Sequence, residues 1–293
     1  MNRTDFTTHN LARLALCLSC ALALSSAVGS AQAQTPSPTP KAEATPKVVV
    51  PPPQIVDEKA EAILRRAVES LGGGAYLNIK SVTGRGYFTQ IAGGVSASTS
   101  SFIDYLIYPD RERTDFKSPG VHDVQTNLDL TKGWVFDGMT KTIKDMDADG
   151  LESFRMTMRT SIDNLLRGAW RKDGASLSYL GRREAGLAKR NEAVRLVYPD
   201  GFVADFEFGA RDGLPAKSSY KRKIKTKEGE DAEVTEEDRV ERYLTFNGVQ
   251  VPFTIDHYRD GEKTSRINYE SIEFNPTIPD AIFAKPVSPK AIK

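Results

Sequence analysis

The chain has 293 residues, of which 40 are basic and 39 acidic, so its formal net charge is only +1. Nucleic-acid-binding proteins usually carry a clear basic excess, so this balance argues against a nucleic-acid partner. Both cysteines, Cys17 and Cys20, lie near the N-terminus. The chain beyond them therefore has no disulfide and no cysteine-bound metal.

The N-terminal segment has the pattern of a secretory signal. After a mildly basic start, residues 14–28 form an apolar run too short to span a bilayer, followed by the small residues Ala31 and Ala33. Signal peptidase reads small residues at such positions. We expect a signal peptide over residues 1–33, cleavage after Ala33 and a periplasmic protein. The alternative is a lipid anchor at Cys20, but the apolar run continues past this cysteine.

The mature chain begins with a segment that cannot fold. Residues 34–54 are rich in Pro, Thr, Ala, Ser and Lys and contain too little apolar surface to form a core. We expect a disordered linker here and one β-rich domain over residues 55–293. This domain opens with a helix, since Asp57 suits an N-cap, apolar residues recur at helical spacing, and the glycines at 72–74 end the pattern.

A second amphipathic helix is predicted from about Leu151 to Trp170, with Phe154 and Met158 on its apolar face. The preceding segment, residues 145–150, imitates the first half of a calcium loop. The twelfth position of such a loop needs a Glu and is Met156 here. We therefore expect an acidic turn that caps the helix rather than a metal site.

Most of the remaining sequence has strand patterns. Two apolar sets alternate along residues 102–108, so both faces of this strand should be covered. Residues 202–208 alternate apolar side chains with Asp205 and Glu207, which predicts one dry and one solvated face. Asn247-Gly248 is a strong signal for a two-residue hairpin turn.

Two further features concern the shape of the sheet. Gly84 and Gly86 lie within a predicted strand, where glycine usually marks a bulge, a bend or a close backbone approach. The charged run over residues 221–241 is interpreted as two strands that project into solvent around a hairpin tip.

The order of these elements resembles the LolA-like superfamily, the periplasmic carriers and sorters of outer-membrane lipoproteins. The matching segments are Tyr108-Pro109-Asp110 with the strand to Phe116, then residues 133–137, 213–217 and 278–286. The resemblance covers roughly residues 57–286 and depends on the order of short motifs. It implies an α+β fold: a strongly curved antiparallel sheet, or half-open β-barrel, covered on its concave face by two helices. The lipoprotein carrier has an arginine that serves the lid where this chain has Tyr108.

The resemblance also implies a function. The expected protein holds a lipid or lipoprotein acyl chain in an apolar barrel cavity and performs no catalysis. Burial of hydrocarbon is worth about 0.8 kcal/mol per CH2, so no catalytic group is needed for such binding. The side chains expected to line the cavity are Phe88, Phe102, Leu106, Tyr108, Trp134, Phe154, Met158, Phe206, Phe253 and Ile255.

Catalytic motifs give no support for an enzyme. Beyond the signal the chain has two histidines, His122 and His257, and neither a Gly-x-Ser-x-Gly nor a His-Glu-x-x-His motif. We expect no cofactor and no metal. The expected partners of the monomer are a lipid or acylated lipoprotein and an envelope membrane protein, with no nucleic acid. The alternative is a cell-envelope interaction scaffold or sensor that uses the same fold without transport.

Overall fold

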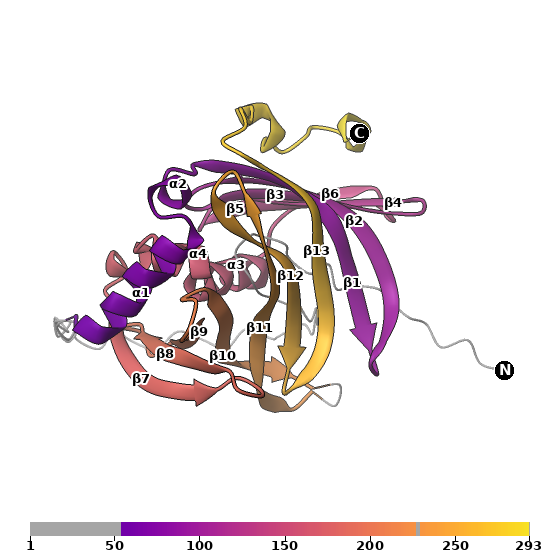
Figure 1. The fold of residues 1–293 in the computed structure, drawn as a ribbon. Coiled ribbons are helices and arrows are strands. Elements are labelled where there is room, and N and C mark those ends of the chain that lie inside the picture. The colour runs from indigo at the N-terminus through magenta and orange to yellow at the C-terminus, as the bar shows by residue number, and fades with distance from the viewer. Residues whose placement is uncertain (1–53, 227–228, 293) are drawn as a thin grey trace, which may run out of the picture.

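The computed structural model describes residues 54–226 and 229–292 (Figure 1). The predicted signal peptide and nearly all of the predicted linker lie outside the described residues. The helices are α1 Glu58–Leu71, α2 Gly74–Leu77, α3 Ala148–Thr160 and α4 Ile162–Leu166, with 3-10 turns η1 Ala169–Arg171, η2 Asp280–Ile282 and η3 Pro289–Ala291. The strands are β1 Ser81–Ala92, β2 Val95–Ile107, β3 Arg111–Ser118, β4 Val121–Asp129, β5 Lys132–Asp137, β6 Thr142–Asp145, β7 Ser176–Glu184, β8 Arg190–Val197, β9 Val203–Gly209, β10 Pro215–Lys225, β11 Asp231–Phe246, β12 Val249–Arg259 and β13 Glu262–Phe274.

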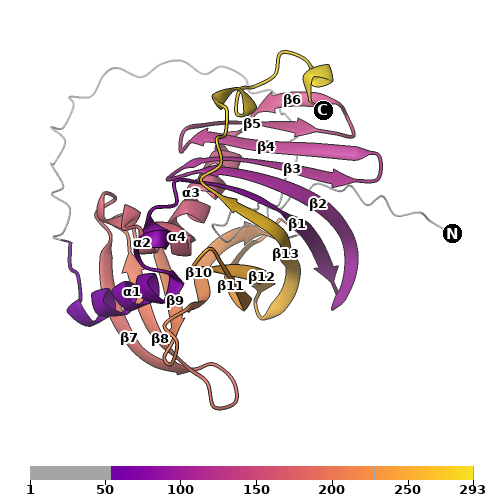
Figure 2. The same cartoon turned by 45° about the horizontal axis from the view of Figure 1, so that its top comes forward.

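These strands form one antiparallel sheet in the order β6-β5-β4-β3-β2-β1-β13-β12-β11-β10-β9-β8-β7. The N-terminal meander therefore joins the C-terminal meander through the β1–β13 pair. Within the described residues the edge strands β6 and β7 do not pair, so the barrel is half open. Figures 1 and 2 show the sheet curving around α3 and α4, with α1 beside β7 and β8. This confirms the expected fold class.

Helix α1 forms as its sequence predicts. Asp57 caps its N-terminus by accepting hydrogen bonds from the backbone N–H groups of Lys59 (2.8 Å) and Ala60 (3.0 Å). Gly72 ends the helix with φ at 122°, a conformation that favours glycine. A Cβ at this position would lie 2.5 Å from the carbonyl oxygen of Gly248, so glycine also allows α1 to approach the β11–β12 hairpin.

The second predicted helix is not continuous, because it breaks at Ser161. The backbone of Ser161 is extended, with φ at −67° and ψ at 126°, so it ends α3. Its side chain then accepts a hydrogen bond from the N–H of Asn164 and starts α4. The acidic turn before α3 is a cap, as predicted, and Asp147 accepts from the N–H of Gly150 at 2.8 Å. Among the described residues, no group of three or more His, Cys, Asp or Glu could hold a metal ion.

The two glycines in β1 mark both a bulge and a close approach. The β1–β13 register shifts between Arg85 and Gly86. A Cβ on Gly84 would lie 2.8 Å from the ring of Tyr269, and one on Gly86 would lie 2.0 Å from the carbonyl oxygen of Asn268. The two glycines therefore allow the Tyr269 ring and the β13 backbone to approach β1 closely.

The face opposite the helices has its own small core, which the sequence did not reveal. Val124, Trp134 and Phe136 pack with Ile292 and Ile143 there. The C-terminal segment is tied to this face, since Trp134 Nε1 donates to the carbonyl oxygen of Phe283 at 2.8 Å. In Figure 2 this segment passes over the end of the sheet that contains β5 and β6. The face of β4–β6 opposite the helices is thus covered. On β2, for which two covered faces were predicted, Phe102 and Leu106 are buried, whereas Ile103, Tyr105 and Ile107 are only partly buried.

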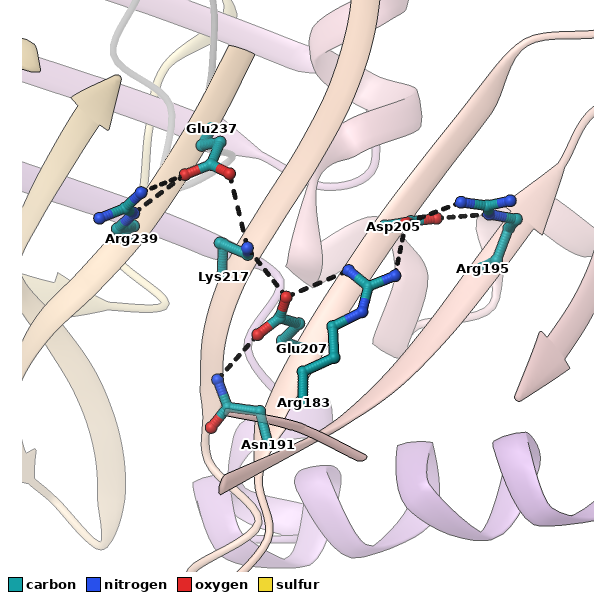
Figure 3. Close-up of polar contacts among 8 residues, drawn as sticks. All are labelled: Arg183, Asn191, Arg195, Asp205, Glu207, Lys217, Glu237 and Arg239. Atoms are coloured by element: carbon teal, nitrogen blue, oxygen red, sulfur yellow. Dashed lines mark hydrogen bonds and ion pairs between the residues drawn. The ribbon is translucent and has the colours of Figure 1, made fainter. Parts of the chain in front are cut away.

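The solvated face predicted for β9 carries a ladder of ion pairs. Asp205 accepts hydrogen bonds from Arg195 (2.6 and 2.9 Å) and Arg183 (3.1 Å). Glu207 lies 2.9 Å from Lys217 and 3.2 Å from Arg183. Figure 3 shows the whole ladder across β7–β11, formed by Arg183, Asn191, Arg195, Asp205, Glu207, Lys217, Glu237 and Arg239. We call this set the convex ladder.

Candidate functional site

A small cavity lies between the helices and the sheet. Its volume is about 30 Å³, which is the space of roughly one water molecule. Its lining comes from α1, α2 and α4 on one side and from β1 and β10–β13 on the other. The lining residues are Leu71, Tyr76, Ile79, Val82, Tyr108, Ile162, Asp163, Pro215, Val240, Tyr243, Val249, Gln250, Val251, Pro252 and Phe274. The wall is apolar except for one carboxyl group, two phenols near it, Tyr243 and one amide.

That carboxyl group fastens the helices to the sheet. Asp163, in α4, accepts a hydrogen bond from the hydroxyl of Tyr108 at 3.0 Å and another from the hydroxyl of Tyr76. One turn further, the Arg167 guanidinium stacks on the rings of Tyr108 (4.0 Å) and Tyr76 (4.9 Å). Arg167 also donates to the carbonyl oxygens of Tyr76 (3.0 Å) and Leu77 (3.2 Å). We call Tyr76, Tyr108, Asp163 and Arg167 the Asp163 latch.

The electrostatics of the latch follow from its burial. Burial raises the pKa of Asp163, while Arg167 and the two tyrosine hydroxyls act in the opposite direction. Tyr243, on the far wall of the cavity, has a pKa raised well above its ordinary value by burial and by the charges of Asp163 and Asp212. Its hydroxyl stays protonated and donates to the carbonyl oxygen of Pro215 at 2.8 Å. The latch is therefore the charged element of an otherwise neutral site.

An apolar surface leads from the cavity to solvent. Phe274, which lines the cavity, packs edge-on against Phe246, with ring centroids 5.8 Å apart. Phe246 lies at the tip of the β11–β12 hairpin, next to the predicted Asn247-Gly248 turn, and is 45% exposed. A hydrocarbon chain that reached this hairpin would meet apolar side chains continuously up to the cavity.

The ten residues predicted to line the cavity fall into four groups. Tyr108 lines the cavity and belongs to the latch. Phe154 and Met158 form a separate buried pair on α3. A third group belongs to the main core under the helices and consists of Phe88, Phe102, Leu106, Phe206 and Ile255, with Phe253 partly buried against it. Trp134 alone forms the fourth group.

Trp134 lies on the opposite face, so it does not line the concave side as predicted. The register pairs Trp134 with Thr126, Thr126 with Arg113, and Arg113 with Tyr105. Trp134 therefore lies on the same face as Tyr105. Phe102 and Leu106 point to the opposite face, because successive side chains along a strand alternate between faces. The sequence of β5 alone could not reveal this, since an alternating pattern does not say which face is concave.

The sequence reasoning also missed three latch residues, Tyr76, Asp163 and Arg167. The available signal was Asp163 itself, which follows Ile162 and precedes Leu165 and Leu166 in a strongly apolar stretch. A carboxylate within the buried stripe of a helix needs partners on the facing element. Those partners come from α2 and from the end of β2, which are far away in sequence.

The two histidines are held by carboxylates. His257 Nδ1 hydrogen-bonds Asp238, and both side chains lie on the concave face opposite Ser218 and Ser265. Burial opposes the protonation of His257, but the charge and the hydrogen bond of Asp238 outweigh it and raise its pKa. His122 Nε2 lies 3.1 Å from Asp115 Oδ2. In residues 54–226 and 229–292, no helix is long and apolar enough to cross a membrane.

Comparisons with known proteins identify the fold. No family model matches the chain, and no curated protein is similar to it in sequence. A DUF1329 family protein from Desulfovibrio piger is similar in structure, with a TM-score of 0.53 and 12% identity over 77% of this chain and 97% of that one. A putative outer membrane lipoprotein-sorting protein domain from Vibrio parahaemolyticus gives 0.50 and 12%, with the same coverage. A LolA superfamily protein from Nitrosomonas europaea gives 0.51 and 14%, again over 77% and 97%. The chain has a LolA-like fold.

Proposed function

We propose that the protein binds the hydrocarbon tail of a lipid, or the acyl chain of a lipoprotein, on the concave face of its sheet and carries it without chemical change. The observation that supports this most is the Asp163 latch. It fastens α2 and α4 to the sheet through a few polar contacts beside a site where apolar packing is incomplete. Such contacts can be exchanged for water, so this is where the helices can separate from the sheet.

The free energy gained by burying a hydrocarbon tail exceeds the free energy lost when the latch opens. A chain of about fourteen carbons gains on the order of 10 kcal/mol when it leaves water, before ordering costs. A hydrogen bond of the latch contributes about 1 kcal/mol net, because water replaces it on opening. The apolar side chains that an entering tail would meet come first from the β11–β12 hairpin and then from the main core. The LolA-like fold is consistent with this activity.

Release of the ligand tests the proposal. The protein is purified from the periplasmic fraction and loaded with a fluorescent fatty acid, and the release rate is followed on dilution. Tyr108→Phe and Tyr76→Phe each remove one hydroxyl from the latch and should speed release about three- to tenfold. Tyr258→Phe is the matched control, since Tyr258 lies opposite Glu237 on the convex face. Failure of the wild type to take up any probe would contradict the carrier and favour a scaffold role.

The proposed compartment is the periplasm. We propose cleavage after Ala33, followed by a linker over residues 34–54 and one domain over residues 55–293. A single sheet that runs through the described residues supports one domain. The intact mass of the secreted protein should correspond to a chain that begins at Gln34. A mass that corresponds to an acylated Cys20 would contradict this processing and indicate a membrane anchor.

A further inference from the structure

The concave face is not apolar throughout. Asp104 lies on β2 between Phe102 and Leu106, on the same face as both, and is 1% exposed. The register places Thr114 opposite Asp104, Glu112 opposite Leu106, and Asn127 opposite Glu112. All of these polar side chains are buried. We call Asp104, Glu112, Thr114 and Asn127 the acceptor patch.

Asp104 has no cation beside it among the described residues. Its hydrogen-bond donor is the hydroxyl of Thr114 at 2.9 Å, and the same hydroxyl lies 3.4 Å from Glu112 Oε1. Within the described part of the chain, no Lys, Arg or His forms an ion pair with Asp104. Burial raises the pKa of this carboxyl group well above its ordinary value, and Asp115 adds to the effect, while Thr114 and the Tyr105 N–H oppose it. A buried acid in this position is stabilised by any cation that reaches it.

Asn127 provides an independent indication. It is 1% exposed, and among the described residues its Oδ1 accepts no hydrogen bond. Buried polar atoms in folded proteins are nearly always hydrogen-bonded, so each exception calls for an explanation. Asn127 lies directly across from Glu112 on the concave face, so its unused acceptor extends the patch from Glu112 onto β4. The patch thus offers oxygen acceptors, and among the described residues the Oδ1 of Asn127 has no donor.

The surroundings of the patch are apolar. Gly84 lies opposite Asp104 on β1, and the ring of Tyr269 covers it. Phe102 and Leu106 flank Asp104 along β2 and belong to the main core. A divalent ion such as calcium takes six to eight oxygen ligands, often including several waters, which these neighbours do not supply. A group that combines N–H donors and one positive charge with a hydrocarbon tail suits both the patch and its walls.

We propose that the acceptor patch binds the ammonium group of an amphiphile whose tail lies along the apolar concave face. This assignment rests on the proposed function and names its ligand class. An ammonium group has three N–H donors, one for each of Asp104, Glu112 and Asn127. Its charge replaces the cation that Asp104 lacks, and charge-assisted hydrogen bonds of this kind are stronger than neutral ones. The ligand enters when the Asp163 latch opens and the helices leave the sheet.

Three ligands with one tail and different head groups test the assignment. Dodecylammonium, dodecanol and dodecanoate are titrated below their aggregation limits into protein loaded with a fluorescent fatty acid, and displacement is measured. The wild type should bind dodecylammonium at least about tenfold more tightly than dodecanol, and dodecanoate most weakly. Asp104→Asn and Glu112→Gln should each reduce this preference severalfold while dodecanol binding stays unchanged.

Asp231→Asn is the matched control, because Asp231 is an exposed carboxylate at the end of the β10–β11 hairpin, where it pairs with Lys225. It should keep the preference of the wild type, provided that circular dichroism shows a folded protein. Equal binding of the three ligands, or a preference that survives both Asp104→Asn and Glu112→Gln, would overturn the assignment and leave the carrier intact. Failure of all three ligands to displace a probe that the protein has taken up would also overturn the assignment and leave the carrier intact, whereas failure to take up the probe at all would contradict the carrier.

Discussion

The convex ladder and the acceptor patch treat buried carboxyl groups in opposite ways. On the convex face, burial acts to raise the pKa values of Asp205 and Glu207, but Arg195, Arg183 and Lys217 outweigh it and lower them. In the acceptor patch, Asp104 has no basic partner within residues 54–226 and 229–292, and its pKa is raised. Asp205 and Glu207 are thus ionised and paired, whereas the surroundings of Asp104 disfavour its charged form.

This difference distinguishes buried carboxyl groups that stabilise the fold from a buried carboxyl group that is proposed to bind a ligand. A ladder in which each acid contacts a base within the chain needs nothing from outside. Acceptors that lack a donor are destabilising and persist where they serve another purpose. The concave face also carries the latch, the cavity and the main core, so Asp104 and the unused Oδ1 of Asn127 lie where a ligand is proposed to bind.

The largest effect is expected in the convex ladder. Glu207→Gln leaves Lys217 and Arg183 without their shared carboxylate, and it should lower the free energy of unfolding by about 2–3 kcal/mol at pH 7. Because the pKa of Glu207 is lowered on folding, its contribution is present above the unfolded value of about 4.3 and is lost as pH falls below it. Urea unfolding at pH 7 and pH 3 measures this. An equal loss at both pH values would contradict the role of the charge.

On the concave face, removal of a carboxyl group is expected to change the free energy of unfolding in the opposite direction. Asp104→Asn removes a buried group whose charged form is disfavoured, so it should raise the free energy of unfolding by about 1 kcal/mol at neutral pH. Since the pKa of Asp104 is raised on folding, the wild type loses stability as pH rises above the unfolded value of about 3.9, and the variant does not. Urea unfolding from pH 4 to pH 8 checks the divergence. A variant less stable than the wild type at neutral pH would show that Asp104 is structural.

Asn127→Leu tests a second member of the acceptor patch. It removes the unused acceptor at nearly constant volume and should stabilise the domain by up to about 1 kcal/mol while it weakens dodecylammonium binding. Thermal unfolding and displacement are measured on the same sample. Lower stability with unchanged binding would remove Asn127 from the acceptor patch.

His257 gives a smaller, pH-dependent effect. Its pKa is raised on folding by Asp238, so its contribution is complete below the unfolded value of about 6.5 and is lost as pH rises through the folded value. His257→Gln should therefore reduce stability more at pH 6 than at pH 9. A difference that is constant across this range would show that the imidazole charge plays no part.

The smallest effect is expected at an exposed ion pair. Arg155 and Glu152 lie one turn apart on α3, with side chains 40% and 54% exposed. Glu152→Gln should lower the free energy of unfolding by about 0.3 kcal/mol, and this difference should disappear at high salt. This variant calibrates the ladder, and a loss as large as that of Glu207→Gln would undermine the distinction between buried and exposed pairs.

Local patterns in the sequence were sufficient for the framework of the fold. The Asp57 cap, the glycine stop of α1, the Asn247-Gly248 hairpin and the alternation around Asp205 each depend on neighbours in sequence, and each was predicted correctly. The break at Ser161 was missed because apolar spacing continues through it, and only the backbone of one residue differs.

The site depends on contacts between distant segments. Asp163 meets Tyr76 and Tyr108 across 87 and 55 residues, which no periodicity encodes. Trp134 was expected to line the cavity on the concave side, but the register of β3–β5 places it on the opposite face. Asp104 could have been noticed, since an acid on the Phe102 side of an apolar strand is out of pattern.

The most direct test of the central claim is native mass spectrometry of the protein purified from the periplasm without detergent. The carrier account predicts a bound species of one amphiphile per chain, which organic extraction releases and which contains a basic nitrogen. Repeated preparations that contain only the bare chain, and that take up no added amphiphile, would contradict it.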